Sequence, residues 1–253
     1  MKGRWLIDLA ARMLDGSISA RDAAGFSAAR LRTKPVSFPL GGVSFFSADH
    51  STWSAAADIF LGQVYNPPGF EIRGGWVVVD VGAHRGVFSA YAVTQGAERV
   101  FSFEPDPSNF SHLEEMIARY SWQQVRATHA ALAARSGQAR LQMGRTTTRG
   151  TTVNAAKDVE EIVEVPALSL DDALADIDQV DLLKMDCEGA EFEILQAAAP
   201  ATLERIRRIS LEYHAAQGSA ELQALLELLK TEFNSIRVEP RRGYTLGYIY
   251  ALR

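Results

Sequence analysis

The sequence predicts an α/β fold built on a doubly wound, mostly parallel sheet of seven strands, with a helical extension before it and an antiparallel hairpin at its end. From Trp76 onward, short apolar runs alternate with segments of helical periodicity, which is typical of parallel strands joined by crossover helices. The last two apolar runs are joined only by the loop Pro240–Tyr244, which is too short for a crossover and makes the pair antiparallel. We therefore expect one α/β domain over 70–253, preceded by an extension over 1–69.

The extension is expected to begin with two helices. Apolar residues recur at helical spacing from Trp5 to Leu14, and Ser19 followed by Asp22 has the pattern of a capping box that starts a second helix. Pro35 ends that helix. The expected elements of the extension are helices over 5–14, 19–31 and 53–61, and a hairpin over 36–47.

The α/β domain opens with the run Trp76–Asp80, which is too short for a helix and resembles strands buried on both faces of a parallel sheet. Asp106 and Pro107 form a strong helix start, because Asp is a good N-cap and Pro fits the first helical position. The expected strands are 76–80, 99–103, 125–129, 180–185, 206–213, 235–238 and 245–252, and the expected helices are 86–94, 106–120, 188–200 and one that starts at 219.

Composition excludes several classes of protein. The chain has 253 residues, of which 47% are hydrophobic and 23% are charged, so it is neither collagen-like nor disordered. A net charge of −5 gives no basic footprint for nucleic acid, and no apolar run approaches the ~20 residues of a membrane span. Charged residues interrupt the N-terminus where a signal peptide needs an apolar core, and the single Cys187 forms no internal disulfide. We expect a soluble, cytoplasmic protein without a nucleic-acid or membrane partner.

Two acidic residues follow neighbouring strands. The first strand leads into the turn Asp80–Gly86, which has small residues but lacks the G-x-G-x-x-G spacing of a pyrophosphate cradle. An Asp there suits an ammonium group, although an ordinary strand–helix turn is the alternative. Glu104 ends the next strand, where an acidic side chain can bind both hydroxyls of a ribose. S-adenosylmethionine has a ribose and a cationic amino-acid end but no pyrophosphate, so it fits both the acidic turn at Asp80 and the carboxylate of Glu104.

Three motifs carry a resemblance to a known family. They read Asp-Val-Gly-Ala-His-Arg-Gly at 80–86, Phe-Glu-Pro at 103–105 and Lys-Met-Asp-Cys-Glu-Gly-Ala-Glu at 184–191. This set resembles the FkbM family of class I S-adenosylmethionine-dependent methyltransferases, from about Tyr65 to the C-terminus. The third motif is the specific one. One departure is His84, where the family usually has Asn.

The resemblance implies S-adenosylmethionine as cofactor, with the first turn at its methionine end, Glu104 at the ribose and the residues around Ala131 beside the adenine. Tyr65 either closes over the cofactor or is a packed aromatic. The predicted cofactor-binding residues are Tyr65, Asp80, Gly82, Ala83, Gly86, Glu104, Pro105, Ala131 and Asp186. The family commonly methylates hydroxyls of sugars or natural products in bacterial pathways, so the resemblance implies an O-methyltransferase of secondary metabolism that acts on a small molecule.

Catalysis needs a group that takes the acceptor's proton, since the cofactor supplies the electrophile. Asp186 ends the fourth strand of the domain, and Glu212 and His214 lie at the end of the fifth, so these three are the predicted catalytic residues. Lys184 shares a side of its strand with Asp186, and we favour a structural ion pair for it. We predict no metal, although magnesium bound by oxygen and imidazole ligands is the alternative that four residues leave open. These are Asp186, Glu188, Glu212 and His214.

The acceptor and the partners are defined less sharply than the cofactor. A carboxylate or nitrogen acceptor, a nicotinamide-dependent oxidoreductase on a degenerate Rossmann fold and a non-catalytic binding module remain as rivals. The extension is expected to cover the acceptor pocket or to form a homodimer contact. The Arg/Thr-rich stretch 144–152 and Arg241-Arg242 either steer an anionic acceptor or are solvated loops.

Overall fold

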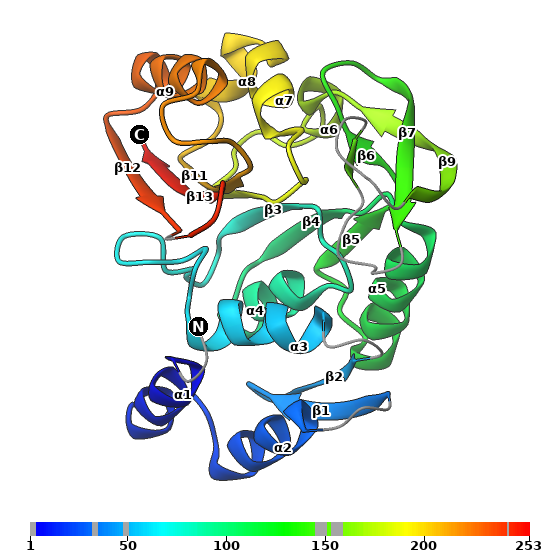
Figure 1. The fold of residues 1–253 in the computed structure, drawn as a ribbon, viewed down its shortest axis with the longest axis vertical. Helices are drawn as coiled ribbons and strands as arrows, with labels where there is room; N and C mark the ends of the chain where they lie inside the picture. Colours follow the sequence, from blue (N-terminus) through cyan, green and yellow to red (C-terminus); the bar gives the residue numbers. More distant parts are fainter. Residues whose placement is uncertain (1–3, 32–34, 48–50, 145–150, 153–158, 242) are drawn as a thin grey trace.

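The computed structural model describes residues 4–31, 35–47, 51–144, 151–152, 159–241 and 243–253. Figure 1 shows a central sheet with helices on both faces and the N-terminal elements packed below one of these helical layers. In the part of the chain that is described, no helix combines the length and apolar character needed to span a bilayer.

The central sheet has seven strands in the order β12-β13-β11-β10-β3-β4-β5, which confirms the predicted fold class. The strand β13 pairs antiparallel with both β11 and β12, while the pairs from β11 to β5 are parallel. The strand order reverses between β3 and β10, which is where ligands bind in doubly wound sheets. The strands are β3 (Val77–Val81), β4 (Arg99–Phe103), β5 (Val125–Thr128), β10 (Leu182–Met185), β11 (Arg208–Tyr213), β12 (Ser235–Pro240) and β13 (Gly247–Leu252).

Two apolar cores lie on the two faces of this sheet. Because side chains alternate along a strand, Val78 packs into the core beneath α4 (Val87–Thr94) and α5 (Pro107–Tyr120). Val79 packs into the other core, beneath the helices that follow β10. These helices are α7 (Glu191–Ala197), α8 (Pro200–Glu204) and α9 (Ala220–Glu232), with the short α6 (Leu170–Ala173) before β10 (Figure 1).

The N-terminal elements continue the core on the α4 face. The predicted hairpin forms, and the side chain of Ser19 accepts a hydrogen bond from the Asp22 N–H as a helix cap. Trp53 stacks on Phe26 with ring centroids 4.5 Å apart, and Phe60 meets Tyr91 of α4 edge to face. These contacts fix the segment against the domain. Its elements are α1 (Arg4–Leu14), α2 (Ala20–Arg30), β1 (Val36–Leu40), β2 (Val43–Ser47), α3 (Ser51–Ala56) and the π-helix η1 (Ala57–Leu61).

A second sheet of four strands, in the order β6-β9-β7-β8, lies between β5 and α6 and was not expected from the sequence. In β9, Val163, Val165 and Ala167 recur at every second position and are separated by Glu164 and Pro166, and this period of two was the available signal. Residues 145–150 of the stretch expected as a loop lie outside the described residues. The strands are β6 (Ala131–Leu132), β7 (Gly137–Gly144), β8 (Thr151–Thr152) and β9 (Val159–Leu168).

Candidate active site

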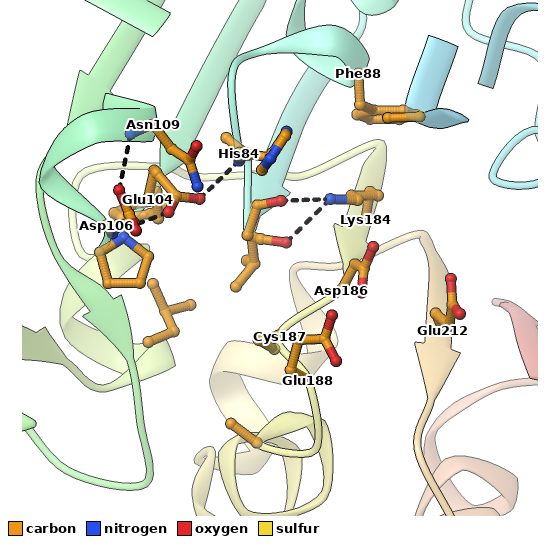
Figure 2. Close-up of a pocket in the computed structure, with 18 of the residues that line it drawn as sticks. His84, Phe88, Glu104, Asp106, Asn109, Lys184, Asp186, Cys187, Glu188 and Glu212 are labelled. Atoms are coloured by element: carbon orange, nitrogen blue, oxygen red, sulfur yellow. Dashed lines mark hydrogen bonds between the residues drawn. The ribbon is translucent and has the colours of Figure 1, made fainter. Parts of the chain in front are cut away.

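A cavity of about 340 Å³ lies at the carboxyl ends of β3, β4, β10 and β11, beside the reversal of strand order. In the view of Figure 2, Glu104 lies on one side of it and Asp186 and Glu212 lie on the other. Among the predicted site residues, those in the cavity wall are Tyr65, Gly82, Ala83, Glu104, Pro105, Ala131, Asp186 and Glu212.

The turn after β3 brings backbone to the cavity. Gly82 has φ +71°, and a Cβ on it would overlap the carbonyl oxygen of Asp186, so only glycine allows the two strand ends to approach this closely. His84 follows with φ +52° and also lines the cavity. Like Asn, His is enriched among residues with left-handed backbone, so the departure from the family pattern keeps the shape of the turn.

Asp80 lies below the cavity and not in its wall, which corrects the prediction that it lines the methionine end. It is fully buried, its Oδ1 lies 3.0 Å from Nζ of Lys184, and its Oδ2 accepts a hydrogen bond from Ser89 at 2.7 Å. The structural ion pair favoured for Lys184 is present, although Lys184 also lines the cavity. Gly86 is likewise absent from the wall, because it packs against Leu113 of α5.

Glu104 is held from both sides by backbone. Its Oε2 accepts a hydrogen bond from the His84 N–H at 2.6 Å, and its Oε1 accepts one from the Asp106 N–H at 2.9 Å (Figure 2). Burial raises the pKa of Glu104 to about 7, although both hydrogen bonds favour its charged form. The carboxylate is therefore fixed in the wall and changes its charge near neutral pH.

The second sheet supplies an apolar end to the cavity. Ala131 and Leu132 of β6 line it together with Leu141 of β7 and Val165 of β9. Only Ala131 was predicted as a site residue. Leu132 is among the residues around Ala131 that were expected beside the adenine, whereas Leu141 and Val165 were missed together with the strands that carry them.

Tyr65 joins the two carboxylates at the other end. Its hydroxyl donates to Oδ2 of Asp186 at 2.8 Å and also lies 3.1 Å from Oε2 of Glu212, a second acceptor. Tyr65 is 4% exposed, and its ring packs edge to face on Phe88 and Tyr248. Tyr65 is therefore tied to the acidic pair at the strand tips.

His214 does not line the cavity, which corrects its prediction as the base. It faces the start of α7, with Nδ1 3.3 Å from Glu191 and Nε2 3.6 Å from Glu188. Burial lowers the pKa of His214, but hydrogen bonding and charge from Glu191, with further carboxylates, raise it overall to about 9. Its imidazole is then already protonated at neutral pH and is unable to take a proton from an acceptor.

The four residues named for a magnesium alternative do not converge. Within the described ranges, the set with ligand atoms within 4.8 Å of one another is Asp186, Glu191 and His214, without Glu212. Both oxygens of Glu191 accept backbone hydrogen bonds, from the N–H groups of Cys187 and Gly189. This set therefore forms an ion-pair cluster that anchors the loop before α7.

The part of the cavity lined by η1 and the loop after β12 carries charge of both signs. Asp58 of η1 and Arg241 after β12 line it, with Arg241 Nη2 3.8 Å from Asp58 Oδ2, and Tyr248 of β13 lies beside them. Of the basic groups considered either for steering an acceptor or as solvated loops, Arg241 lines the cavity, while Arg242 and residues 145–150 lie outside the described residues.

The residues present fit S-adenosylmethionine. The cavity has a backbone cradle at Gly82 that a Cβ would fill, a buried carboxylate for the ribose at Glu104 and an apolar slot for the adenine. Its volume of about 340 Å³ is in the range of small-molecule pockets.

Comparisons with known proteins agree with the geometry. A model of the methyltransferase FkbM domain matches residues 80–246. The chain is 29% identical over 202 residues to the 31-O-demethyl-FK506 methyltransferase FkbM of Streptomyces tacrolimicus. This match covers 67% of this chain and 77% of that protein. The chain is 28% identical over 214 residues to the AMB antimetabolite synthetase AmbE of Pseudomonas aeruginosa, which covers 68% of this chain. That match spans only 10% of the length of the synthetase.

A solved structure gives the same fold. A proposed rRNA methylase of Clostridium thermocellum superposes with a TM-score of 0.50 and 14% identity, covering 76% of this chain and 94% of that one. At this identity the likeness concerns the fold alone.

Proposed function

The chain belongs to the FkbM methyltransferase family, and from this we propose that it transfers a methyl group from S-adenosylmethionine to a hydroxyl of a small molecule. The observation that carries the proposal is one cavity that joins the buried Glu104 to the acidic pair Asp186 and Glu212. The relative from Streptomyces tacrolimicus is named as a methyltransferase of 31-O-demethyl-FK506, which supports an oxygen acceptor. We extend this to the role in secondary metabolism that the family resemblance implies.

Different parts of the cavity would bind different parts of the cofactor. Glu104 would hold the ribose hydroxyls, Gly82 and Ala83 would cradle the methionine end, and the slot between Ala131 and Val165 would hold the adenine. When bound, S-adenosylmethionine supplies a methyl group on a positively charged sulfur, from which it is readily displaced.

The acidic pair Asp186 and Glu212 would remove the proton of the acceptor hydroxyl. A hydroxyl is a poor nucleophile until its proton is removed, and a carboxylate in hydrogen-bond reach can remove it. Asp186 and Glu212 are the cavity-lining carboxylates at the tips of β10 and β11, and Tyr65 fixes their orientation. The α3 and η1 segment lines the same cavity with Ser51, Ser54 and Ile59, and would cover the acceptor and exclude water.

Binding and label transfer test the proposal. Calorimetry should show binding of S-adenosylmethionine and S-adenosylhomocysteine and none of NAD. Binding of NAD without the sulfonium compound would overturn the cofactor assignment. Hydroxylated metabolites are then screened with cofactor carrying a ¹³C-methyl group, since the carbon shift of the product distinguishes methyl on oxygen from methyl on nitrogen. A labelled N-methyl or methyl ester product would correct the acceptor class.

A further inference from the structure

Two carboxylates in the cavity share a single hydrogen-bond donor. The hydroxyl of Tyr65 has one proton, yet it lies within hydrogen-bond distance of both Asp186 and Glu212, at 2.8 and 3.1 Å. Two carboxylates held this close repel each other when both are charged, so one of them tends to keep a proton.

Each of the cations nearby is shared with at least one other acid. Lys184 is paired with Asp80, and Arg241 faces Asp58. His214 faces Glu188 and Glu191, and one of its ring nitrogens also lies within 4.8 Å of a carboxylate oxygen of Asp186. Tyr248 of β13, which packs on Tyr65, is a neutral phenol and brings no positive charge. No described cation is therefore committed to Asp186 and Glu212 alone. Burial and the charge of Asp186 raise the pKa of Glu212 to about 7, although His214, Arg241 and the hydrogen bond from Tyr65 act to lower it.

We propose that Asp186 and Glu212 hold one proton between them while the cavity contains no sulfonium group, and that they release it to solvent when the sulfonium cofactor binds. This inference rests on the proposed function. It makes the base fully ionised only in an enzyme loaded with a methyl donor. The neutral product sulfide brings no such charge, so the pair can keep its proton in the product complex.

The charges balance through the reaction. The ionised pair takes the proton of the acceptor hydroxyl as the bond between the acceptor oxygen and the methyl carbon forms. The bond between the methyl carbon and sulfur breaks in the same step, and its electron pair stays on sulfur. The pair thereby returns to its singly protonated form in the same step that removes the positive charge from the cavity.

Proton release on binding can be measured without an acceptor. Titration calorimetry at pH 7 in buffers of different ionisation enthalpy counts the protons released by S-adenosylmethionine and by S-adenosylhomocysteine. Both contain the ribose and so share any contribution from Glu104. We expect S-adenosylmethionine to release about half a proton more, because the pKa of Glu212 is about 7. In the wild type this difference should vanish at pH 9, where the pair is already ionised.

Variants locate the proton. Glu212→Gln should abolish the difference, while Glu193→Gln on the exposed side of α7 should leave it unchanged. Tyr65→Phe removes a donor that favours the charged forms, so the difference should persist to higher pH. Equal proton release by the two ligands would overturn the inference and leave the proposed function standing. Failure of both ligands to bind would instead refute the cofactor site.

Discussion

Lys184 and Asp80 face each other across two neighbouring strands directly below the cavity. They are register partners in the parallel pair β10 and β3, and Nζ of Lys184 lies 3.0 Å from Oδ1 of Asp80. Their side chains are 4% and 0% exposed. Lys184 also donates to the carbonyl oxygens of Val81 and Gly82 (Figure 2), so this pair ties the floor of the cavity to the turn that lines it.

Breaking this pair should destabilise the whole domain. We expect Asp80→Asn to lower the free energy of unfolding by about 3–5 kcal/mol, because it leaves Lys184 buried without its counter-charge. The double variant Asp80→Asn/Lys184→Met should lose less free energy of unfolding than the sum of the losses in the two single variants. Glu227→Gln in the exposed Lys230–Glu227 pair is the control, with an expected change below about 1 kcal/mol. Urea denaturation measures all four, and strict additivity would contradict the account.

The tips of the main strands were predictable because local patterns define them. A short apolar run followed by a small or acidic residue marks the end of β3, β4 and β10, which placed Glu104 and Asp186 correctly at the sheet edge. The role of Asp80 was not predictable in this way. Whether it points into the cavity or beneath it depends on its register with Lys184, about 100 residues later in the chain.

The rest of the site depends on tertiary contacts. The second sheet was missed because β6 has two residues and β9 is rich in Glu, so neither stands out as an apolar strand. His214 follows the cavity-lining Glu212 by two positions, but its side chain contacts Glu191 of α7 and does not line the cavity. The link from Tyr65 to Asp186 joins residues 121 positions apart, which no local pattern reveals.

Gly82 should tolerate no side chain. Gly82→Ala places a Cβ against the Asp186 carbonyl, so we expect weaker binding of S-adenosylhomocysteine and a lower free energy of unfolding. Gly69→Ala is a matched control, because Gly69 also has positive φ but has nothing within 4 Å of the point that a Cβ would occupy. That control should cost only the backbone strain of about 1–2 kcal/mol. Equal effects of the two changes on unfolding and binding would refute the close approach at Gly82.

Glu104 should make cofactor affinity depend on pH. A carboxylate with a pKa of about 7 loses its charge below that pH and can no longer accept both ribose hydroxyls, so affinity should fall as the solution is acidified. If a single proton controls binding, the affinity falls by at most about tenfold for each pH unit. S-adenosylhomocysteine is the appropriate ligand, since it carries no sulfonium charge. Glu104→Gln should bind more weakly, by more than about 1 kcal/mol at pH 8, and with a flatter pH profile. Calorimetry from pH 5.5 to 8.5 measures both, and parallel profiles would exclude Glu104 as the titrating group.

His214 should stabilise the fold in a pH-dependent way without acting as the base. Its pKa is raised from 6.5 to about 9, so its ion pairs contribute fully below pH 6.5 and are lost as the pH rises through 9. We expect His214→Gln to lower the free energy of unfolding more at pH 6 than at pH 10, and Glu188→Gln to make the wild-type pH dependence smaller. Because His214 lies outside the cavity wall, His214→Gln should keep its affinity for S-adenosylhomocysteine. An equal cost at both pH values, measured by urea denaturation, would show that His214 is not held as a cation by Glu188 and Glu191.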